Sequence, residues 1–273
     1  MKTSSEYRAA AWKEWRAQMS QSSIIILLSM IVGMVSVSAL YGSFLWYTTT
    51  HSMVAASITL LIAIAVILTV SLLNYFVPVW FLTLVRKQQK WYEVRTSYGR
   101  ALLTAWVILL PTVVQEAVSM PMNMTNEPSV IMSLVFLAVM PAVVLFIIWW
   151  TYAIGTTLPF RVLDHPDRSV FQAIKENIRM MNGYKFQLFC VDFMIMIWPI
   201  VGLCVLLLFM AICMVFVVLL NPGTNMIIWL SIGLGLVMLP FVVVYGFIFE
   251  PMLYIAHAQF YDDLRAEKEL NDR

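Results

Sequence analysis

Three acidic residues, Glu116, Asp192 and Glu250, lie inside long apolar stretches of the sequence. A charged side chain near the middle of a lipid bilayer costs about 2.5 to 3.5 kcal/mol on insertion scales, so residues of this kind are functional candidates by default. Asp192 and Glu250 each lie near one end of their stretch and could together hold a proton, an ion or a substrate. Glu116 is expected at the opposite membrane surface, in contact with water.

One helix face near the C-terminus repeats polar side chains at the helical spacing i, i+4, i+7 and i+11, namely Glu250, Tyr254, His257 and Tyr261. Asp192 is expected at a similar depth on the preceding apolar stretch. The candidate intramembrane polar cluster therefore comprises Asp192, Glu250, His257 and Arg161. Two interpretations stay open: a site for a proton, ion or substrate, or structural pairing of polar residues at the edge of the bilayer.

The sequence contains none of the common catalytic signatures. A His-Glu-x-x-His zinc motif, a Gly-x-Ser-x-Gly nucleophile elbow, a glycine-rich phosphate loop and a Cys-x-x-Cys pair are all missing. His51, His165 and His257 fall in separate parts of the chain, which argues against a shared metal site. We therefore expect a protein that is not an enzyme and that needs no cofactor or metal.

The chain that must position these residues is too apolar for a water-soluble fold. Of its 273 residues, 62% are hydrophobic and 12% are charged, about half the charge of an ordinary soluble domain. The 17 Lys and Arg and 15 Asp and Glu residues cannot cover the surface of a soluble fold of this size. The net charge of +2 is too small for a nucleic-acid-binding patch. We expect an integral membrane protein whose main partner is the lipid bilayer and that binds no nucleic acid.

Six apolar runs are long enough to cross a bilayer, which takes about 20 residues per helix. The sequence therefore predicts an all-α fold, a polytopic bundle of six transmembrane helices forming one domain over residues 1–273. Prolines inside or near several runs predict kinked helices. The runs also form three hairpins of similar plan, as in an internal repeat. The predicted spans are residues 23–46, 53–85, 101–122, 129–158, 188–220 and 226–256, followed by a tail at 257–273.

Basic residues lie on one side of these spans. All 17 Lys and Arg residues fall before the first span, between the second and third, between the fourth and fifth, or after the sixth. The opposite loops carry only Glu127 as a formal charge. Because loops rich in Lys and Arg stay in the cytoplasm, we expect both termini there, in a multi-pass protein of the bacterial inner membrane.

Amphipathic helices are predicted on the basic side, lying along the membrane surface. Residues 1–22 place Tyr7, Ala11, Trp15 and Met19 at four-residue spacing. The segment 86–98 is a weaker candidate. Such helices would seat the spans and attract anionic lipid at the cytoplasmic face. The predicted interfacial anchors are Trp12, Trp15, Trp91, Tyr184 and Tyr261.

The best amphipathic pattern precedes the fifth span. Ser169 and Gln172 match a capping box at its start, and Gly183 is placed to cap its end. Its apolar stripe is predicted to contain Val170, Phe171, Ile174, Ile178 and Met181.

Four stretches of the C-terminal part resemble a known family. They are residues 159–167 (PFRVLDHPD), residues 180–189 (MMNGYKFQLF), the Val191-Asp192 pair and Ala258-Gln259-Phe260-Tyr261. With its Asp-x-Pro turn, its Gly-Tyr-Lys segment leading to Phe, and an acid opening a span, the chain resembles the bacterial integral-membrane family called "domain of unknown function 975". The resemblance implies a membrane fold and location, and it carries no established activity.

Two functions fit these observations. The first is a non-enzymatic inner-membrane protein that acts through contacts within the bilayer, as a scaffold, an envelope accessory or an immunity-type factor with a membrane-protein or peptide partner. The second is a small transporter or channel component that uses Asp192 and Glu250. Neutralising both acids should separate the two, because only transport depends on them.

Overall fold

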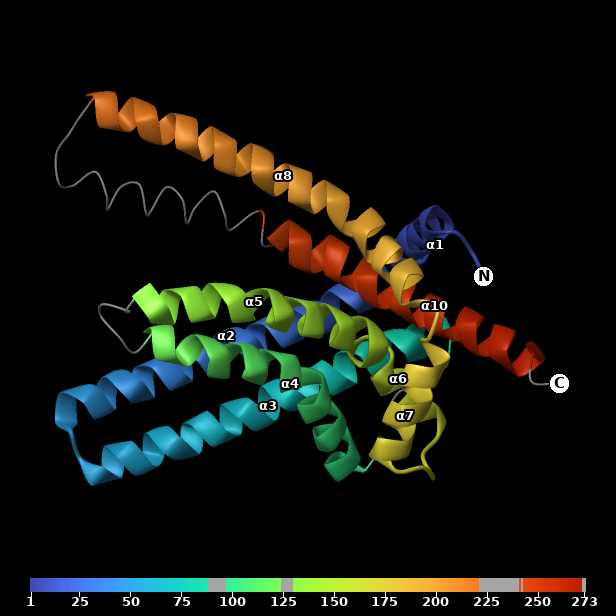
Figure 1. Ribbon diagram of the computed structural model, residues 1–273, viewed down its shortest axis with the longest axis horizontal. Coiled ribbons are helices and arrows are strands. Elements are labelled where there is room, and N and C mark those ends of the chain that lie inside the picture. Colours follow the sequence, from blue (N-terminus) through green and yellow to red (C-terminus); the bar gives the residue numbers. More distant parts are fainter. Residues whose placement is uncertain (88–96, 124–129, 221–240, 242, 272–273) are drawn as a thin grey trace.

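The structure of the chain is a computed structural model, which describes residues 1–87, 97–123, 130–220, 241 and 243–271. Within these ranges every regular element is a helix (Figure 1). The predicted all-α fold is therefore confirmed for the described part of the chain.

Five helices of the described part are long and apolar enough to cross a membrane, with a mean hydropathy of 1.7 to 2.8 in their most apolar windows. Each coincides with one of the first five predicted spans. The sixth predicted span, residues 226–256, lies largely outside the described residues, so the count of six stays a prediction. The helices are α2 (Met19–Thr50), α3 (Met53–Val85), α4 (Tyr98–Asn123), α5 (Val130–Trp150) and α8 (Lys185–Leu220).

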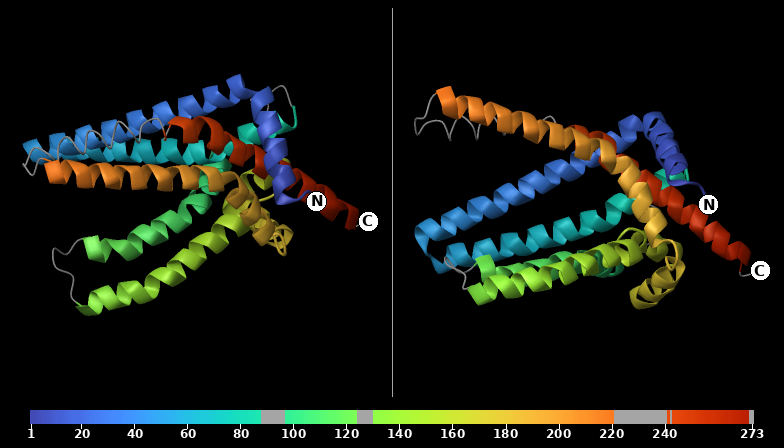
Figure 2. Two further views of the ribbon diagram at one scale, coloured as in Figure 1. Left: turned by 90° about the horizontal axis from the view of Figure 1, so that it is seen from above. Right: turned by 45° about the horizontal axis from the view of Figure 1, so that its top comes forward.

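The long helices spread like arms from one end of the molecule (Figures 1 and 2). Helices α2 and α3 form a hairpin, which turns at His51 in the left-handed conformation and at Ser52, whose hydroxyl accepts from the backbone N–H of Ala55. Helix α8 diverges from α4 and α5. In the most apolar windows of the five helices, only 6 to 22% of the residues are buried. Their apolar surfaces are therefore available to lipid or to another membrane protein.

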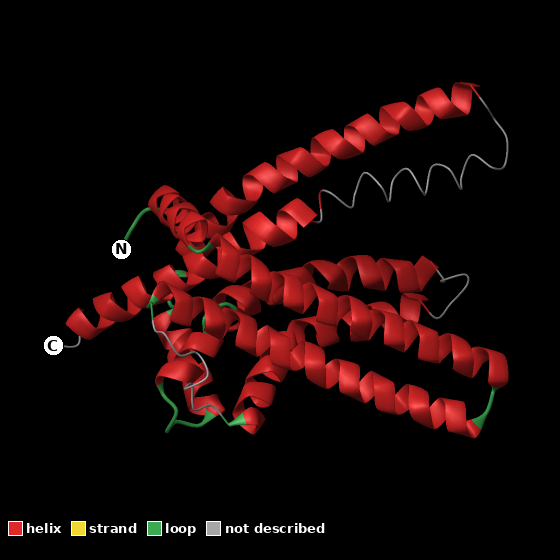
Figure 3. Cartoon of the chain, turned by 180° about the vertical axis from the view of Figure 1, so that it is seen from behind, coloured by secondary structure: helices red, strands yellow, loops and turns green. Residues whose placement is uncertain are grey.

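The short helices and both termini gather at the opposite end from the arm tips (Figures 1 and 3). We call this region the polar end. It contains α1 (Ser4–Ala17), α6 (Leu158–Asp164), α7 (Val170–Met180) and the C-terminal part of α10 (Glu250–Asn271).

Helix α1 forms within the predicted segment 1–22 but ends at Ala17, leaves Met19 exposed at the start of α2, and packs on protein. Thr3 and Glu6 cap its start reciprocally, and Tyr7, Ala11 and Trp15 lie on one buried face. That face is covered by α8 and α10. Trp15 is therefore a core residue, and its prediction as a membrane-surface anchor is wrong. A four-residue apolar spacing identifies the buried face of a helix without telling whether lipid or protein covers it.

The predicted tail at residues 257–273 continues as helix α10 as far as Asn271. Phe260, Tyr261 and Leu264 are fully buried in the core of the polar end. Tyr261 contacts the ring of Phe160, with ring centroids 5.4 Å apart. The tail is thus part of the fold, and Tyr261 is a core residue and not a surface anchor.

Helix α7 confirms the predicted capping box of Ser169 and Gln172. Gly183 follows the helix at φ +89°, a conformation in which glycine avoids the strain of a side chain. The buried face differs from the predicted stripe, because Phe171 is 70% exposed. Burial follows the three- to four-residue spacing of Val170, Ala173, Asn177 and Met180.

Candidate functional site

Two of the four residues predicted for the intramembrane cluster meet between α8 and α10. Nε2 of His257 lies 2.6 Å from Oδ1 of Asp192, within hydrogen-bond distance. Both side chains are largely buried, with 11% and 16% of their surface exposed. Tyr152 lies close enough to Asp192 for the two side chains to interact electrostatically. Sequence reasoning missed Tyr152, which lies in another predicted span.

The other two predicted members lie elsewhere. Glu250 interacts with Tyr254, one turn further along the same helix. It lies seven residues before His257, about 10 Å along the helix axis at 1.5 Å per residue. Arg161 belongs to α6 and donates to Glu176 over 3.0 Å. The predicted four-residue cluster is therefore wrong as a single site, because shared depth in the membrane does not bring side chains of different helices together.

Two π-helical segments interrupt the long helices beside this pair: η2 (Thr151–Gly155) and η3 (Tyr245–Phe249). A π-helical turn changes the backbone hydrogen-bond pattern of an α-helix, and such turns are frequent at functional sites. In η3 the carbonyl of Phe247 accepts from the Trp15 indole N–H over 3.1 Å. In η2 the carbonyl of Ala153 accepts from the Asn177 amide over 2.9 Å. Each segment is thus held by a side chain of a short helix, α1 or α7.

Asn177 is fully buried, and its amide oxygen also accepts from the buried hydroxyl of Thr157 over 3.1 Å. We expect Asn177→Ala to lower the free energy of unfolding by about 1 to 3 kcal/mol, because it leaves both partners buried without a hydrogen bond. Unfolding in mixed detergent micelles, followed by tryptophan fluorescence, measures the change. Lys175→Ala, on the exposed face of the same helix, is the matched control, with an expected change within about 0.5 kcal/mol. Equal effects of the two substitutions would contradict this role of Asn177.

An ionic cluster, which we call the Arg86 clamp, joins three helices at the polar end. Arg86 follows the last residue of α3 and forms a bidentate pair with Asp164 of α6, at 2.7 and 3.0 Å. It also contacts Asp262 of α10, with a shortest distance of 2.6 Å. Asp164 accepts two further hydrogen bonds, from Tyr261 at 2.9 Å and from Arg265 at 2.8 Å.

Asp164 is the centre of the clamp. Its side chain is only 6% exposed, and it accepts four hydrogen bonds, one on Oδ1 and three on Oδ2. Burial opposes the charge of Arg86, but the hydrogen bonds that Arg86 donates to Asp164 and Asp262 prevail and raise the pKa of Arg86 above its usual range. Burial, and then the charge of Asp164, raises the pKa of the Tyr261 phenol. The clamp is therefore charged on Arg86 and protonated on Tyr261 at neutral pH.

The residues of the Arg86 clamp stand out in the sequence, but for reasons other than contact with one another. Asp164 lies in the Asp-x-Pro turn, and Tyr261 closes the Ala-x-Phe-Tyr stretch, both of which carry the family resemblance. In the sequence Arg86 is one of the basic residues whose distribution predicts the cytoplasmic side. The structure shows that these separate stretches meet.

Of the remaining predicted anchors, Trp12 and Tyr184 both contact other side chains of the protein. Trp12 is partly exposed and stacks on Trp15, with ring centroids 5.0 Å apart, while the guanidinium of Arg16 lies 4.7 Å from its ring. The Tyr184 hydroxyl donates to Glu267 over 2.8 Å. Trp91 and most of the predicted helix over 86–98 lie outside the described residues.

The two polar groups differ in what they can do chemically. In the Arg86 clamp the charges of the members are largely compensated by one another, which suits a structural joint. The other group, which we call the Asp192 group, has a carboxylate and an imidazole in hydrogen-bond contact and the Tyr152 phenol near them, which suits proton exchange. No protein-family model, no curated protein and no solved structure matches the chain.

Proposed function

We propose that the chain is a non-enzymatic, multi-pass protein of the bacterial inner membrane that acts through contacts inside the bilayer. Its role would be that of a scaffold, an envelope accessory or an immunity-type factor. The observation that carries this proposal is the contrast between a tightly packed polar end and long apolar arms with little burial. The distribution of Lys and Arg supports placing the polar end, and with it both termini, in the cytoplasm.

The packing explains why the arms suit binding. The Arg86 clamp and the buried face of α1 hold the helices at one end, so the arms start from a fixed base. Lipid tails are as apolar as leucine, so a partner helix gains no hydrophobic energy by replacing them and must pack closely instead. Spread arms offer long faces for such packing.

Site-specific photo-crosslinking in cells tests the scaffold proposal. A photoreactive residue at Leu60 of α3 or Leu137 of α5, both more than 60% exposed, should give a discrete protein adduct. The same residue at Leu270, which is exposed at the C-terminal end of α10, is the matched control and should not give this adduct. Lipid adducts alone at both arm positions would contradict the proposal.

The alternative function, a small transporter or channel component, is favoured by the Asp192–His257–Tyr152 contacts between three helices. Under this hypothesis, Asp192→Asn combined with Glu250→Gln abolishes proton or ion flux in proteoliposomes, because the acids carry the charge. Glu116→Gln, at an exposed position of α4, is the control. If the double variant keeps full function at normal abundance, transport through these acids is wrong. If it loses flux at normal abundance and the wild-type protein gives lipid adducts alone at both arm positions, the transporter proposal replaces the scaffold.

A further inference from the structure

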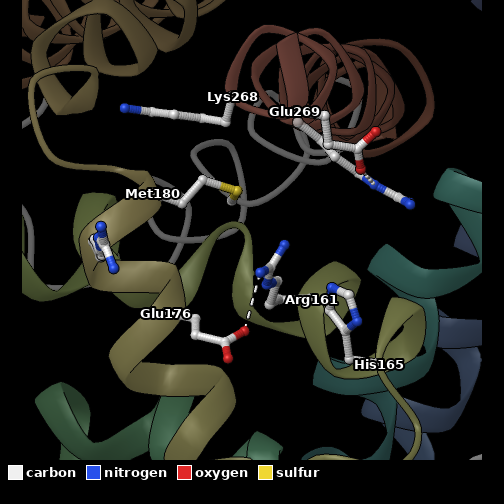
Figure 4. A pocket seen from close by; sticks show the side chains of 8 residues that line it. Arg161, His165, Glu176, Met180, Lys268 and Glu269 are labelled. Carbon is white, nitrogen blue, oxygen red and sulfur yellow. Dashed lines mark hydrogen bonds and ion pairs between the residues drawn. The ribbon is translucent and has the colours of Figure 1, made fainter. Parts of the chain in front are cut away.

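A cleft of about 460 Å³ opens at the polar end, between α6, α7 and α10. Figure 4 shows Arg161 and His165 together on one side, with Lys268 and Glu269 on α10 across the opening. Glu176 and Met180 line it from α7. We call it the basic cleft; its remaining lining residues are Arg179 and Arg265.

The charges of the basic cleft do not balance. Glu176 is bound by Arg161 over 3.0 Å and also by Arg168. Glu269 is bound by Arg265 over 2.8 Å. These pairs neutralise the acids of the lining, and two basic residues remain. Among the described residues neither Lys268 nor Arg179 has an ion-pair partner, and the Lys268 ammonium lies 5.3 Å from the centroid of the Tyr184 ring.

The cleft also holds polar nitrogens without partners. Nε of Arg161 and Nε2 of His165 are buried, and neither makes a hydrogen bond within the described residues. A buried donor without a partner is energetically unfavourable, so a ligand that accepts a hydrogen bond there is favoured. Burial, and then the charges of Arg161 and Arg168, lowers the pKa of His165, which is therefore a neutral donor or acceptor at pH 7.

From this geometry we infer that the basic cleft binds a phosphate group, with Arg179 and Lys268 supplying the charge and Arg161 a hydrogen-bond donor. Phosphate matches the lining because its oxygens accept several hydrogen bonds from arginine and lysine at once. Two sources present this chemistry at a membrane surface: the headgroup of an anionic lipid and a soluble phosphate compound. The inference does not rest on the scaffold proposal, since neither the apolar arms nor the Asp192 group forms part of the cleft.

The experiment measures phosphate binding by the whole protein in lipid nanodiscs. One arm uses discs of phosphatidylcholine with a minor share of phosphatidylglycerol, and native mass spectrometry counts the anionic lipid that stays bound after release from the disc. The other arm uses discs of phosphatidylcholine alone and titrates inorganic phosphate by calorimetry. Retained phosphatidylglycerol identifies a lipid headgroup, and phosphate binding without it identifies a soluble ligand; either outcome supports the cleft.

The variants remove charge without touching the Arg86 clamp. Arg179→Gln with Lys268→Gln should weaken the binding detected by at least about tenfold, and Arg179→Gln alone should weaken it several-fold. Lys268→Gln also removes the contact of Lys268 with the Tyr184 ring, whereas Arg179→Gln alone keeps that contact and tests the charge by itself. The matched control, Lys13→Gln with Lys175→Gln, removes two exposed charges outside the cleft and should leave binding unchanged. Absence of binding in both arms, or equal losses in the variant and the control, would overturn the inference.

Discussion

Replacing Arg86 with methionine is expected to lower the free energy of unfolding by about 3 to 5 kcal/mol, the range found when one partner of a buried ion pair is removed. The substitution keeps most of the side-chain length but removes the guanidinium that contacts both Asp164 and Asp262. Asp164 then keeps two of its four hydrogen bonds, and two carboxylates are left facing each other at the polar end. Chemical unfolding in mixed micelles, followed by tryptophan fluorescence, measures the loss.

Arg86→Lys separates charge from geometry. Lysine keeps the positive charge but lacks the planar fork that binds two carboxylates at once, so we expect a loss between those of wild type and Arg86→Met. The matched control is Lys2→Met, which breaks an exposed pair with Asp263 and should cost less than about 1 kcal/mol. If Arg86→Met is no more harmful than Lys2→Met, the clamp does not stabilise the fold.

The spans could be predicted because length and apolarity are properties of the chain itself. The apolar run predicted at 53–85 coincides with α3, and the run at 188–220 is contained in α8. Capping of α7 was equally local, since Ser169 and Gln172 are three residues apart. Such features need no knowledge of the tertiary structure.

The partners of helix faces could not be predicted in the same way. Trp15 and Tyr261 lie on apolar helix faces at the basic side of the spans. The sequence pattern of such a face is the same whether lipid or protein covers it. In the Arg86 clamp, Asp164 lies 78 positions and Asp262 lies 176 positions after Arg86 in the sequence. The geometry of the clamp therefore depends on how α3, α6 and α10 pack. The contact of Asp192 with His257 is one of several contacts that are possible among polar residues at a similar depth in the membrane. Which of these contacts forms depends on the rotation of each helix about its own axis.

The C-terminal segment provides the second large expected effect. Phe260→Ala should lower the free energy of unfolding by about 3 to 5 kcal/mol, the usual cost of truncating a buried aromatic side chain. Phe260 is fully buried and packs on Tyr7 of α1, with ring centroids 5.5 Å apart, so the loss also loosens the N-terminal helix. Leu270→Ala, at a position 71% exposed on the same helix, is the matched control and should change stability by less than about 0.5 kcal/mol. A free cytoplasmic tail would tolerate both substitutions equally, so the difference in unfolding free energy between them measures directly how far the C-terminal segment belongs to the core.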